Sequence, residues 1–255
     1  MHVTLIPLKI PILQVSQDLG KAIVAAVKEQ NLRVRRGDVI AVASKIVSIC
    51  QGRIVRLSEV RASGKAETLA RKWKMGKQLA QVVMDEADVI LGGVKGFMLT
   101  LKDNILTANA GVDMKNSPPG TATLWPTNPD QSAKELRGML ERRYKCKIGV
   151  MIVDSRVTPM RLGTTGLAIG VSGFHPIRDE RGKPDLYGRE IRFTRTNVAD
   201  DLAASAHLLM GESKERAGVV VVRGAPVELS ESGSGRAAEL NLERCLIARN
   251  LSEAR

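Results

Sequence analysis

The sequence predicts an α+β protein in which strands and helices are mixed rather than strictly alternating. Hydrophobic residues make up 44% of the 255-residue chain, which is enough for a sizeable core. Apolar runs of strand length recur between segments with helical spacing. Aromatic residues make up only 3% of the chain, so that core must be built from aliphatic side chains and methionine.

The first half of the chain is expected to form short strands and helices. Residues 2–8 alternate weakly and read as a strand that prolines close. Residues 17–30 have helical spacing, and the RRGD segment at 35–38 reads as a turn. The remaining expectations are a long strand over 39–49, helices over 64–75 and 76–87, and strands over 88–93, 94–101 and 104–113.

The second half is expected to continue in the same way. An amphipathic helix starts in NPDQSAKELRGMLERRY, with Asp130 or Ser132 as its N-cap. A Ser/Gly-rich loop, SESGSG, precedes a helix near 236–250 at the C-terminus. Between them we expect strands over 148–153, 165–171 and 191–198, a helix over 199–212 and a buried strand over 218–224.

The charge of the chain is compatible with several kinds of partner. A formal net charge of +12 suggests a phosphate-rich substrate, a nucleic acid or an anionic membrane. Lysine and arginine are spread along the chain, and aromatic rings for stacking bases are scarce, which disfavours nucleic acid. No apolar run approaches the roughly 20 residues of a membrane span. A well-solvated basic surface with no specific anionic partner is the competing interpretation of this charge.

Cysteine and histidine usage indicates a reducing, cytoplasmic compartment and no histidine-rich zinc site. The chain has three cysteines, none in a CxxC pair, and three histidines. The opening MHVTLIPLKIPIL lacks a charged segment and a cleavage site, so it reads as a strand and not as a signal peptide.

Three acidic residues occupy similar positions in the sequence. Asp113, Asp154 and Glu212 each lie where an apolar element meets an irregular loop, which is where functional side chains are usually carried. If they converge, their oxygens form a site for a hard divalent cation, to which the Ser155 hydroxyl adds a fourth oxygen. Taken one at a time, an aspartate after a strand is more often a turn-former than a metal ligand.

Basic residues close to these acids are candidates for holding a phosphate. Arg156 and Arg161 follow Asp154, and Lys45 follows a predicted strand. A planar guanidinium matches phosphate geometry, and Gly163 and Gly166 would let the backbone approach a ligand closely. A surface salt bridge is the competing interpretation of Arg161. From these residues alone, the chain is a mixed α/β protein with an anion-binding character.

Eight motifs in order resemble the coenzyme F420-0:L-glutamate ligase family, also called F420-0 gamma-glutamyl ligase. No single motif is decisive, and together they span nearly the whole chain up to about residue 225. They are ASKIVSICQGR at 43–53, NAGVD at 109–113 with Asn116 after it, PTNPDQSA at 126–133, IVDS at 152–155, GLAIGVSG at 166–173, DLYGRE at 185–190, VADDLAASAHLLMGE at 198–212 and VVVVRG at 219–224.

The resemblance implies an activity, cofactors and an assembly. The family adds L-glutamate to the lactyl carboxylate of F420-0, a deazaflavin that carries a phospholactate, and converts GTP to GDP and phosphate. It uses Mg²⁺ or Mn²⁺ and often K⁺, and its unusual α+β fold forms intertwined homodimers. The catalytic domain would cover 1–225, as one unit or as two intertwined subdomains, and residues 226–255 would belong to the same unit.

The resemblance also assigns site residues. Arg161 would act as a catalytic contact to phosphate. The metal ligands would be Asp113, Asp154, Ser155 and Glu212, with Ser155 in place of a threonine. The nucleotide contacts would be Ile10, Pro11, Ile12, Leu13, Ser44, Lys45, Asn116, Met210, Gly211, Glu212, Ser213 and Lys214.

Two segments depart from the family pattern. The family usually carries a lysine after the serine that corresponds to Ser48, whereas this chain has Ile49. The stretch from Ser155 to Pro159 replaces a Thr-x-Gly-Arg segment, although Arg161 and Gly163 remain aligned. We therefore keep two alternatives: a divergent GTP- or ATP-dependent ligase for another phosphate-bearing acid, and an inactive, basic nucleic-acid-binding homologue.

The mechanism expected from this resemblance needs no protein nucleophile. Transfer of the GTP γ-phosphoryl group to the substrate carboxylate would give an acyl phosphate, which the glutamate amine would attack. Metals held by the acidic residues would neutralise the developing charge, so catalysis would come mainly from positioning and electrostatics.

Overall fold

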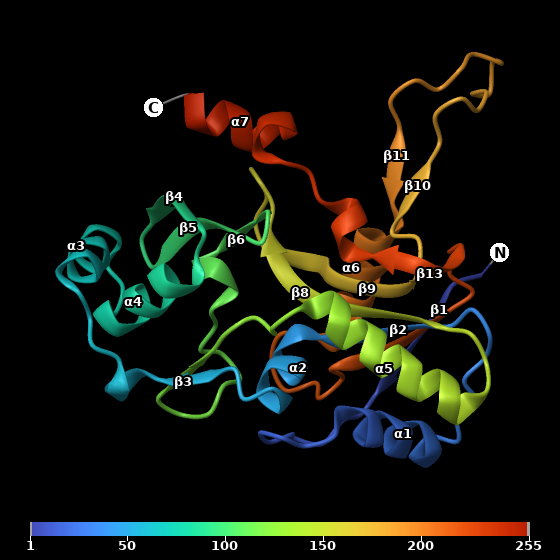
Figure 1. Ribbon diagram of the computed structural model, residues 1–255, viewed down its shortest axis with the longest axis horizontal. Helices are drawn as coiled ribbons and strands as arrows, with labels where there is room; N and C mark the ends of the chain where they lie inside the picture. Colours follow the sequence, from blue (N-terminus) through green and yellow to red (C-terminus); the bar gives the residue numbers. More distant parts are fainter. Residues whose placement is uncertain (1, 254–255) are drawn as a thin grey trace.

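A six-stranded sheet forms the centre of the computed structural model, which describes residues 2–253 (Figure 1). Its two central neighbours, β2 and β8, run parallel, and the other pairings of this sheet are antiparallel. In spatial order the strands are β1 (Thr4–Leu8), β12 (Val219–Arg223), β2 (Val39–Ala43), β8 (Gly149–Val157), β9 (Thr164–Phe174) and β13 (Leu229–Ser234).

Helices cover both faces of this sheet, because alternate residues of its central strands point to opposite sides. Ile40 of β2 and Ile152 of β8 pack with α1 (Leu19–Glu29), α2 (Ser44–Cys50) and α5 (Pro129–Tyr144) in one core. Val39 and Met151 pack with α6 (Val198–Met210) in the other. With both faces buried, these strands read as continuous apolar runs in the sequence.

Residues between α2 and α5 build a smaller lobe, on the left of Figure 1. Its core contains Trp73, Val83 and Met98. At its base, Glu86 binds Arg53 and Lys102, each at 2.8 Å. The lobe consists of β3 (Ile54–Arg56), α3 (Gly64–Trp73), α4 (Lys77–Glu86), β4 (Val89–Val94), β5 (Phe97–Lys102), β6 (Ile105–Ala108) and β7 (Thr121–Thr123), where β3 pairs with β7 and β5 lies between β4 and β6.

Two further segments project from the body. β10 (Ile177–Asp179) and β11 (Arg195–Asn197) pair as a two-stranded ribbon that extends away from the sheet in Figure 1. The chain ends in α7 (Leu246–Glu253), which follows two 3₁₀ turns at Gly235–Ala238 and Leu242–Arg244. Within residues 2–253, no helix has both the length and the apolar character needed to cross a bilayer.

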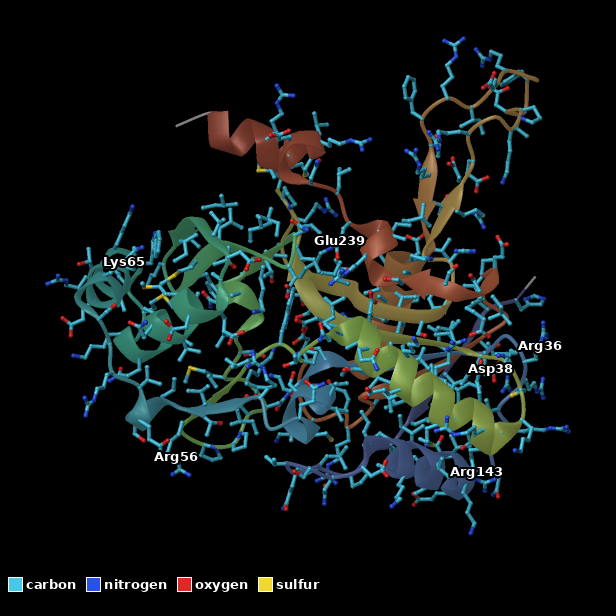
Figure 2. The ribbon with its side chains drawn as sticks, in the orientation of Figure 1. Arg36, Asp38, Arg56, Lys65, Arg143 and Glu239 are labelled. Carbon is cyan, nitrogen blue, oxygen red and sulfur yellow. The ribbon has the colours of Figure 1, made fainter. Side chains whose placement is uncertain are left out.

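The positive charge is distributed over both parts of the molecule. Figure 2 shows Arg56 and Lys65 on the small lobe, whereas Arg36 and Arg143 lie at the opposite end. Several basic side chains have acidic partners, such as Arg223, which binds the buried Asp38 at 2.8 Å. The spread of charge expected from the sequence is therefore also a spread in space.

The predicted element types are confirmed for most of the chain. The strand at 2–8, the helices at 17–30, 64–75, 76–87 and 199–212, and the buried strand at 218–224 appear within a few residues of their expected bounds. The long strand over 39–49 is wrong in its second half, because the chain turns into α2 at Ser44. Val47 packs into the core from this helix. A strand through the same apolar residues could also have buried Val47, so the sequence did not distinguish the two.

Other strand bounds were also wrong. The strand over 104–113 ends at Ala108 and gives way to a tight turn. Only Arg195–Asn197 of the segment 191–198 is a strand, since Val198 begins α6. Asp154 and Ser155 do not form the tip of a strand, because β8 continues to Val157 beside β9.

The start of α5 and the C-terminal region differ most from expectation. Asn128 occupies the N-cap position in a left-handed conformation with no side-chain cap, followed by Pro129. Asp130 instead accepts hydrogen bonds from Val171 N, Ser234 Oγ and Gly235 N. These bonds hold the Ser/Gly-rich segment as strand β13 and not as a loop. The helix expected over 236–250 is replaced by the two 3₁₀ turns and the shorter α7.

Candidate functional site

The candidate site begins where the parallel strands β2 and β8 lie side by side. Ala43, the last residue of β2, pairs with Val153 of β8, so Ser44 and Asp154 follow at the same edge. A bulge between Ile152 and Val153 shifts the register with β9 just before Asp154. Because parallel neighbours bring corresponding ends together, residues 110 positions apart in sequence reach one place.

The Asp154 carboxylate is held by several donors. It accepts hydrogen bonds from the indole of Trp125, from the Ser155 backbone N–H at 2.9 Å and from Ser44. Removal from water raises the pKa of Asp154, and these bonds together with the Lys45 charge only partly oppose that effect. A desolvated carboxylate of this kind is stabilised when a cation approaches it.

Asp113 lies close to the same basic side chain. The Lys45 ammonium binds Asp113 Oδ2 at 2.5 Å and also donates to the Lys115 carbonyl. The backbone N–H of Lys115 donates to Asp113 Oδ1 at 2.8 Å. Asp113 also forms an isolated bridge with Thr123, which connects it to β7. Lys45 therefore links the Asp113 segment to the end of β2.

A left-handed turn directs the chain toward Asp113. Asn109, Ala110 and Gly111 all have positive φ, of 52°, 52° and 73°. Buried hydrogen bonds hold the first two: Asn109 Oδ1 accepts from Met98 N, and the Thr100 hydroxyl accepts from Ala110 N, both at 2.8 Å. A Cβ added at Gly111 would lie 2.1 Å from the Trp125 ring, so this position has room only for glycine.

Glu212 reaches the site from the other side, just after α6. Helix α6 ends at Met210, and Gly211 turns the chain with a φ of 69°. The Glu212 carboxylate binds the Lys115 ammonium, His207 Nε2 at 2.9 Å and the Thr164 hydroxyl at 3.1 Å. Burial alone would raise its pKa, but these hydrogen bonds lower the pKa of Glu212 to about 2.

Two lysines thus interact with the three acids. Lys45 contacts Asp113 and acts electrostatically on Asp154, whereas Lys115 contacts both Asp113 and Glu212. Among residues 2–253 there is no group of three or more His, Cys, Asp or Glu side chains already arranged to hold a metal ion. The donor chemistry nevertheless fits a hard divalent cation, because the set is all oxygen and Asp154 is desolvated.

The two predicted nucleotide segments lie next to each other. Ile10 N donates to the Arg216 carbonyl at 3.0 Å, which joins the segment 10–13 to the loop after α6. Asn116 Nδ2 donates to the Ser213 carbonyl at 3.1 Å, which joins that loop to the Asp113 segment. Ile10 and Met210 are buried in the core, so their side chains serve packing, whereas Ile12 is 78% exposed. Pro11 and Lys214 are exposed, and Leu13 is partly buried.

Comparison with known proteins identifies the family of this chain. The sequence model described as F420-0:Gamma-glutamyl ligase matches residues 7–224. The chain is 37% identical to the coenzyme F420:L-glutamate ligase of Methanopyrus kandleri, covering 82% of this chain and 83% of that protein. It is 38% identical to the Methanocaldococcus jannaschii protein of the same name, with 80% and 81% covered, and 34% identical to the Archaeoglobus fulgidus one, with 94% and 93% covered.

The chain belongs to the F420-0:gamma-glutamyl ligase family. The match ends at Gly224, so the docked strand β13 and helix α7 lie beyond the part that the family model describes. Every site residue inferred from the resemblance, from Ile10 to Lys214, falls inside it. The relatives carry ligase names, which supports an enzyme that forms C–N bonds.

Several residues expected at the site have other contacts or are exposed. Arg156, a candidate for holding phosphate, pairs with Asp200 of α6 at 3.4 Å. Arg161 is exposed in the turn between β8 and β9. Gly166 packs closely against α6, because a Cβ there would lie 2.2 Å from the Ala203 carbonyl. Ser155 contributes its backbone N–H to Asp154.

Sequence reasoning missed several side chains of the candidate site. The side chains of Lys115, Trp125, Thr164 and His207 each contact one of the predicted acids. Of these residues, Lys115 could most easily have been chosen from the sequence, because it lies two residues after Asp113. The sequence does not indicate that Trp125 and Thr164 belong to the site, because the acids that they contact are distant in sequence.

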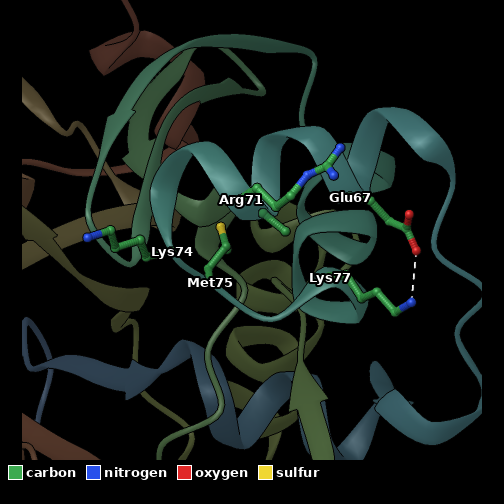
Figure 3. A pocket seen from close by; sticks show the side chains of 6 residues that line it. Glu67, Arg71, Lys74, Met75 and Lys77 are labelled. Atoms are coloured by element: carbon green, nitrogen blue, oxygen red, sulfur yellow. Dashed lines mark hydrogen bonds and ion pairs between the residues drawn. The ribbon is translucent and has the colours of Figure 1, made fainter.

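A separate hollow lies on the small lobe. Figure 3 shows this depression of about 570 Å³ at α3 and α4, lined by Arg71, Lys74 and Met75, with Lys77 bound to Glu67 at 2.8 Å. None of the predicted site residues lines it, and Lys77 already has an acidic partner. The candidate site therefore lies at the end of β2, beside Asp154 of β8, and not in this hollow.

Proposed function

We propose that this chain joins L-glutamate to the carboxylate of F420-0 at the expense of GTP. One observation carries the proposal: in a member of this ligase family, Lys45 and Lys115 connect Asp113 with Glu212, and the Lys45 charge also acts on Asp154. Acids and ammonium groups in one place can receive both a divalent cation and a triphosphate. The adjacent segments 10–13 and 210–216 would form a surface that contacts the nucleotide.

The reaction would proceed in two balanced steps. The substrate carboxylate attacks the γ-phosphorus of GTP, the bond to the β-phosphate oxygen breaks, and GDP leaves. The glutamate amine then attacks the acyl carbon, inorganic phosphate leaves with the bonding electrons, and the phosphate takes up the proton that the amine nitrogen releases. Lys45 and the neighbouring ammonium of Lys115 would orient phosphate oxygens and neutralise charge as it develops.

Asp113, Asp154, Ser155 and Glu212 would hold Mg²⁺ or Mn²⁺. A divalent cation bound there supplies charge neutralisation at the transferring phosphoryl group. The structure favours Asp154 as the principal ligand, because Trp125 and Ser44 fix the carboxylate while leaving its charge poorly hydrated. Its rigid strand would then set the position of the nucleotide phosphates.

We also propose a cytoplasmic homodimer that uses K⁺ together with the divalent cation. The β10–β11 ribbon supports the dimer, since Leu186 is 100%, Tyr187 84% and Phe193 87% exposed. We assign the catalytic unit to 1–225 and residues 226–255 to the same unit, because Arg137 of α5 binds Glu231 of β13 at 2.7 Å. Light scattering checks the dimer, and GTP turnover in Na⁺ and K⁺ buffers checks the monovalent ion.

A second candidate substrate is another acid that carries a phosphate. The segment from Ser155 to Pro159 favours it, because this part of the chain departs from the family pattern. In that alternative the chemistry at Asp154 is the same, and only the acyl acceptor differs.

Mass analysis of the product tests the proposal directly. The protein is incubated with F420-0, L-glutamate, GTP and Mn²⁺, and a product heavier by one glutamyl unit is expected together with GDP and phosphate. Parallel reactions with ATP, with other phosphate-bearing acids and with Asp154→Asn serve as controls. If F420-0 is returned unchanged while another acid is extended, the second candidate is correct. If no acid is extended and binding to nucleic acid falls steeply with salt, the chain is the inactive binding homologue.

A further inference from the structure

Lys115 occupies an unusual place among the acids of the site. Its backbone N–H donates to Asp113 at 2.8 Å, its carbonyl accepts from Lys45, and its ammonium binds Glu212. The backbone of Lys115 is therefore fixed by two neighbours, whereas its side chain is held only at the tip. The lysine side chain is a flexible four-carbon stem, so the ammonium group can move while the backbone stays in place.

The two lysines of the site differ in exposure and in the number of partners. The Lys45 side chain is 23% exposed, and its ammonium is shared between Asp113 and the Lys115 carbonyl. The Lys115 side chain is 56% exposed, and its ammonium has Glu212 as its partner. Glu212 keeps His207 and Thr164 as donors if Lys115 leaves. Lys115 is thus the lysine that can be displaced at small cost.

We propose that Lys115 is an exchangeable cation, which neutralises Glu212 in the free protein and contacts the nucleotide triphosphate once a divalent cation binds Glu212. This inference rests on the proposed function, because it takes the ligand to be a nucleoside triphosphate with its metal. Two positive groups cannot share one carboxylate without repulsion, so metal binding drives the ammonium toward the phosphate. Lys115 then supplies the positive charge that is absent at Ile49.

The exchange predicts two opposite effects of one substitution. Lys115→Met removes a competitor for Glu212, so Mn²⁺ alone should bind roughly three- to tenfold more tightly. The same change removes a charged contact to phosphate, so GTP in saturating Mn²⁺ should bind about tenfold more weakly, which corresponds to about 1.4 kcal/mol. The affinity for GDP should fall less, since the γ-phosphate is missing. Lys115→Arg keeps the charge and should restore most of the GTP affinity.

Two titrations on the full-length protein make the test. Free Mn²⁺ is counted by electron paramagnetic resonance as protein is added, and GTP and GDP binding is followed by calorimetry at fixed Mn²⁺. Lys95→Met is the matched control, because Lys95 is exposed on the turn between β4 and β5 and no site element carries it. Thermal unfolding of each variant shows whether the fold is kept. Tighter Mn²⁺ binding with weaker GTP binding supports the proposal.

Other outcomes overturn it in recognisable ways. Unchanged GTP affinity in Lys115→Met means that Lys115 does not contact phosphate. Weaker binding of Mn²⁺ and of both nucleotides alike means that Lys115 only holds the local structure. Lys45→Met and Asp154→Asn separate this inference from the proposed function. If those variants lose GTP binding while Lys115→Met keeps it, only the role of Lys115 is wrong; if none of the three affects GTP binding, the nucleotide site itself is wrong.

Discussion

Asp154 and Glu212 reach the same site from two different kinds of support. Asp154 lies inside a paired strand, fixed by Trp125 and Ser44, and removal from water raises its pKa. Glu212 lies in a loop after α6, and its three side-chain donors hold its pKa at about 2. The strand provides a precisely placed but poorly neutralised charge, whereas the loop provides a neutralised but movable one. Within one site, Asp154 is therefore suited to fixing the position of a ligand, and Glu212 is suited to exchanging one partner for another.

The largest effect should come from the strand side. Asp154→Asn keeps the shape and removes the charge, and we expect glutamate ligation to slow by roughly a hundred- to a thousandfold. Glu212→Gln should slow it by only about tenfold, since its loop can adjust. Product formation at saturating GTP and Mn²⁺ measures both rates. Equal losses in the two variants would show that the two supports do not differ in catalysis.

The turn before Asp113 tests how rigidly the strand side is built. Gly111→Ala should destabilise the fold by about 3 kcal/mol, because the methyl group meets the Trp125 ring in a left-handed backbone. Gly120→Ala is the matched control, since Gly120 has a φ of 74° and open space around it, and should cost about 1 kcal/mol. Urea unfolding measures both. Equal costs would mean that only the backbone conformation matters.

The desolvated charge should also affect stability. Because folding raises the pKa of Asp154, its contribution is most favourable below the unfolded pKa and becomes unfavourable as the pH rises through the folded pKa. Without metal, Asp154→Asn should therefore be more stable than the parent by about 1 kcal/mol at pH 7, and the gain should disappear in acid.

Urea unfolding across this pH range measures the gain. Asp179→Asn is the control, because Arg181 lowers the pKa of Asp179 and no gain is expected there. A gain that persists in acid would have a cause other than the carboxylate charge.

The smallest effect concerns a single donor on the loop side. Thr164→Val removes one of three side-chain hydrogen bonds to Glu212. The remaining two should limit the change in the free energy of Mn²⁺ binding to about 0.5–1 kcal/mol. Mn²⁺ affinity should change by only a few-fold, as measured by titration. Thr165→Val, one residue along β9, should leave Mn²⁺ affinity at the parent value. A larger effect of Thr164→Val would show that the loop is less adaptable than proposed.

The sequence allowed much of the main sheet to be predicted. Strong local signals were available, such as the continuous apolar run of β12 and the helical spacing over residues 17–30, where α1 forms beside the sheet. The prediction for the segment after β2 was wrong because the apolar residues in KIVSIC suit a strand as well as a helix, and only packing decides between them. Strand β13 was not predicted because its Ser/Gly composition is typical of a loop. In the structure, long-range hydrogen bonds to Asp130 order this segment.

The candidate site was predictable in its acids but not in its connections. Asp113, Asp154 and Glu212 could be chosen because each follows an apolar run in the sequence, with the family resemblance as support, although β8 extends past Asp154 to Val157. The pairing of Lys115 with Glu212 spans 97 residues, and that of Trp125 with Asp154 spans 29. No local pattern encodes such contacts, because they exist only after the sheet has formed.

The order of strands in the main sheet has a consequence for synthesis of the protein. β2 needs β12 on one edge and β8 on the other, and both are made long after it. A ribosome must therefore add some 175 further residues before the fully apolar edge of Val39–Ala43 is closed by Val219–Val222. Until then the nascent chain presents an uncovered β-edge, which favours aggregation. Slow expression at low temperature, or chaperone co-expression, should accordingly raise the soluble yield.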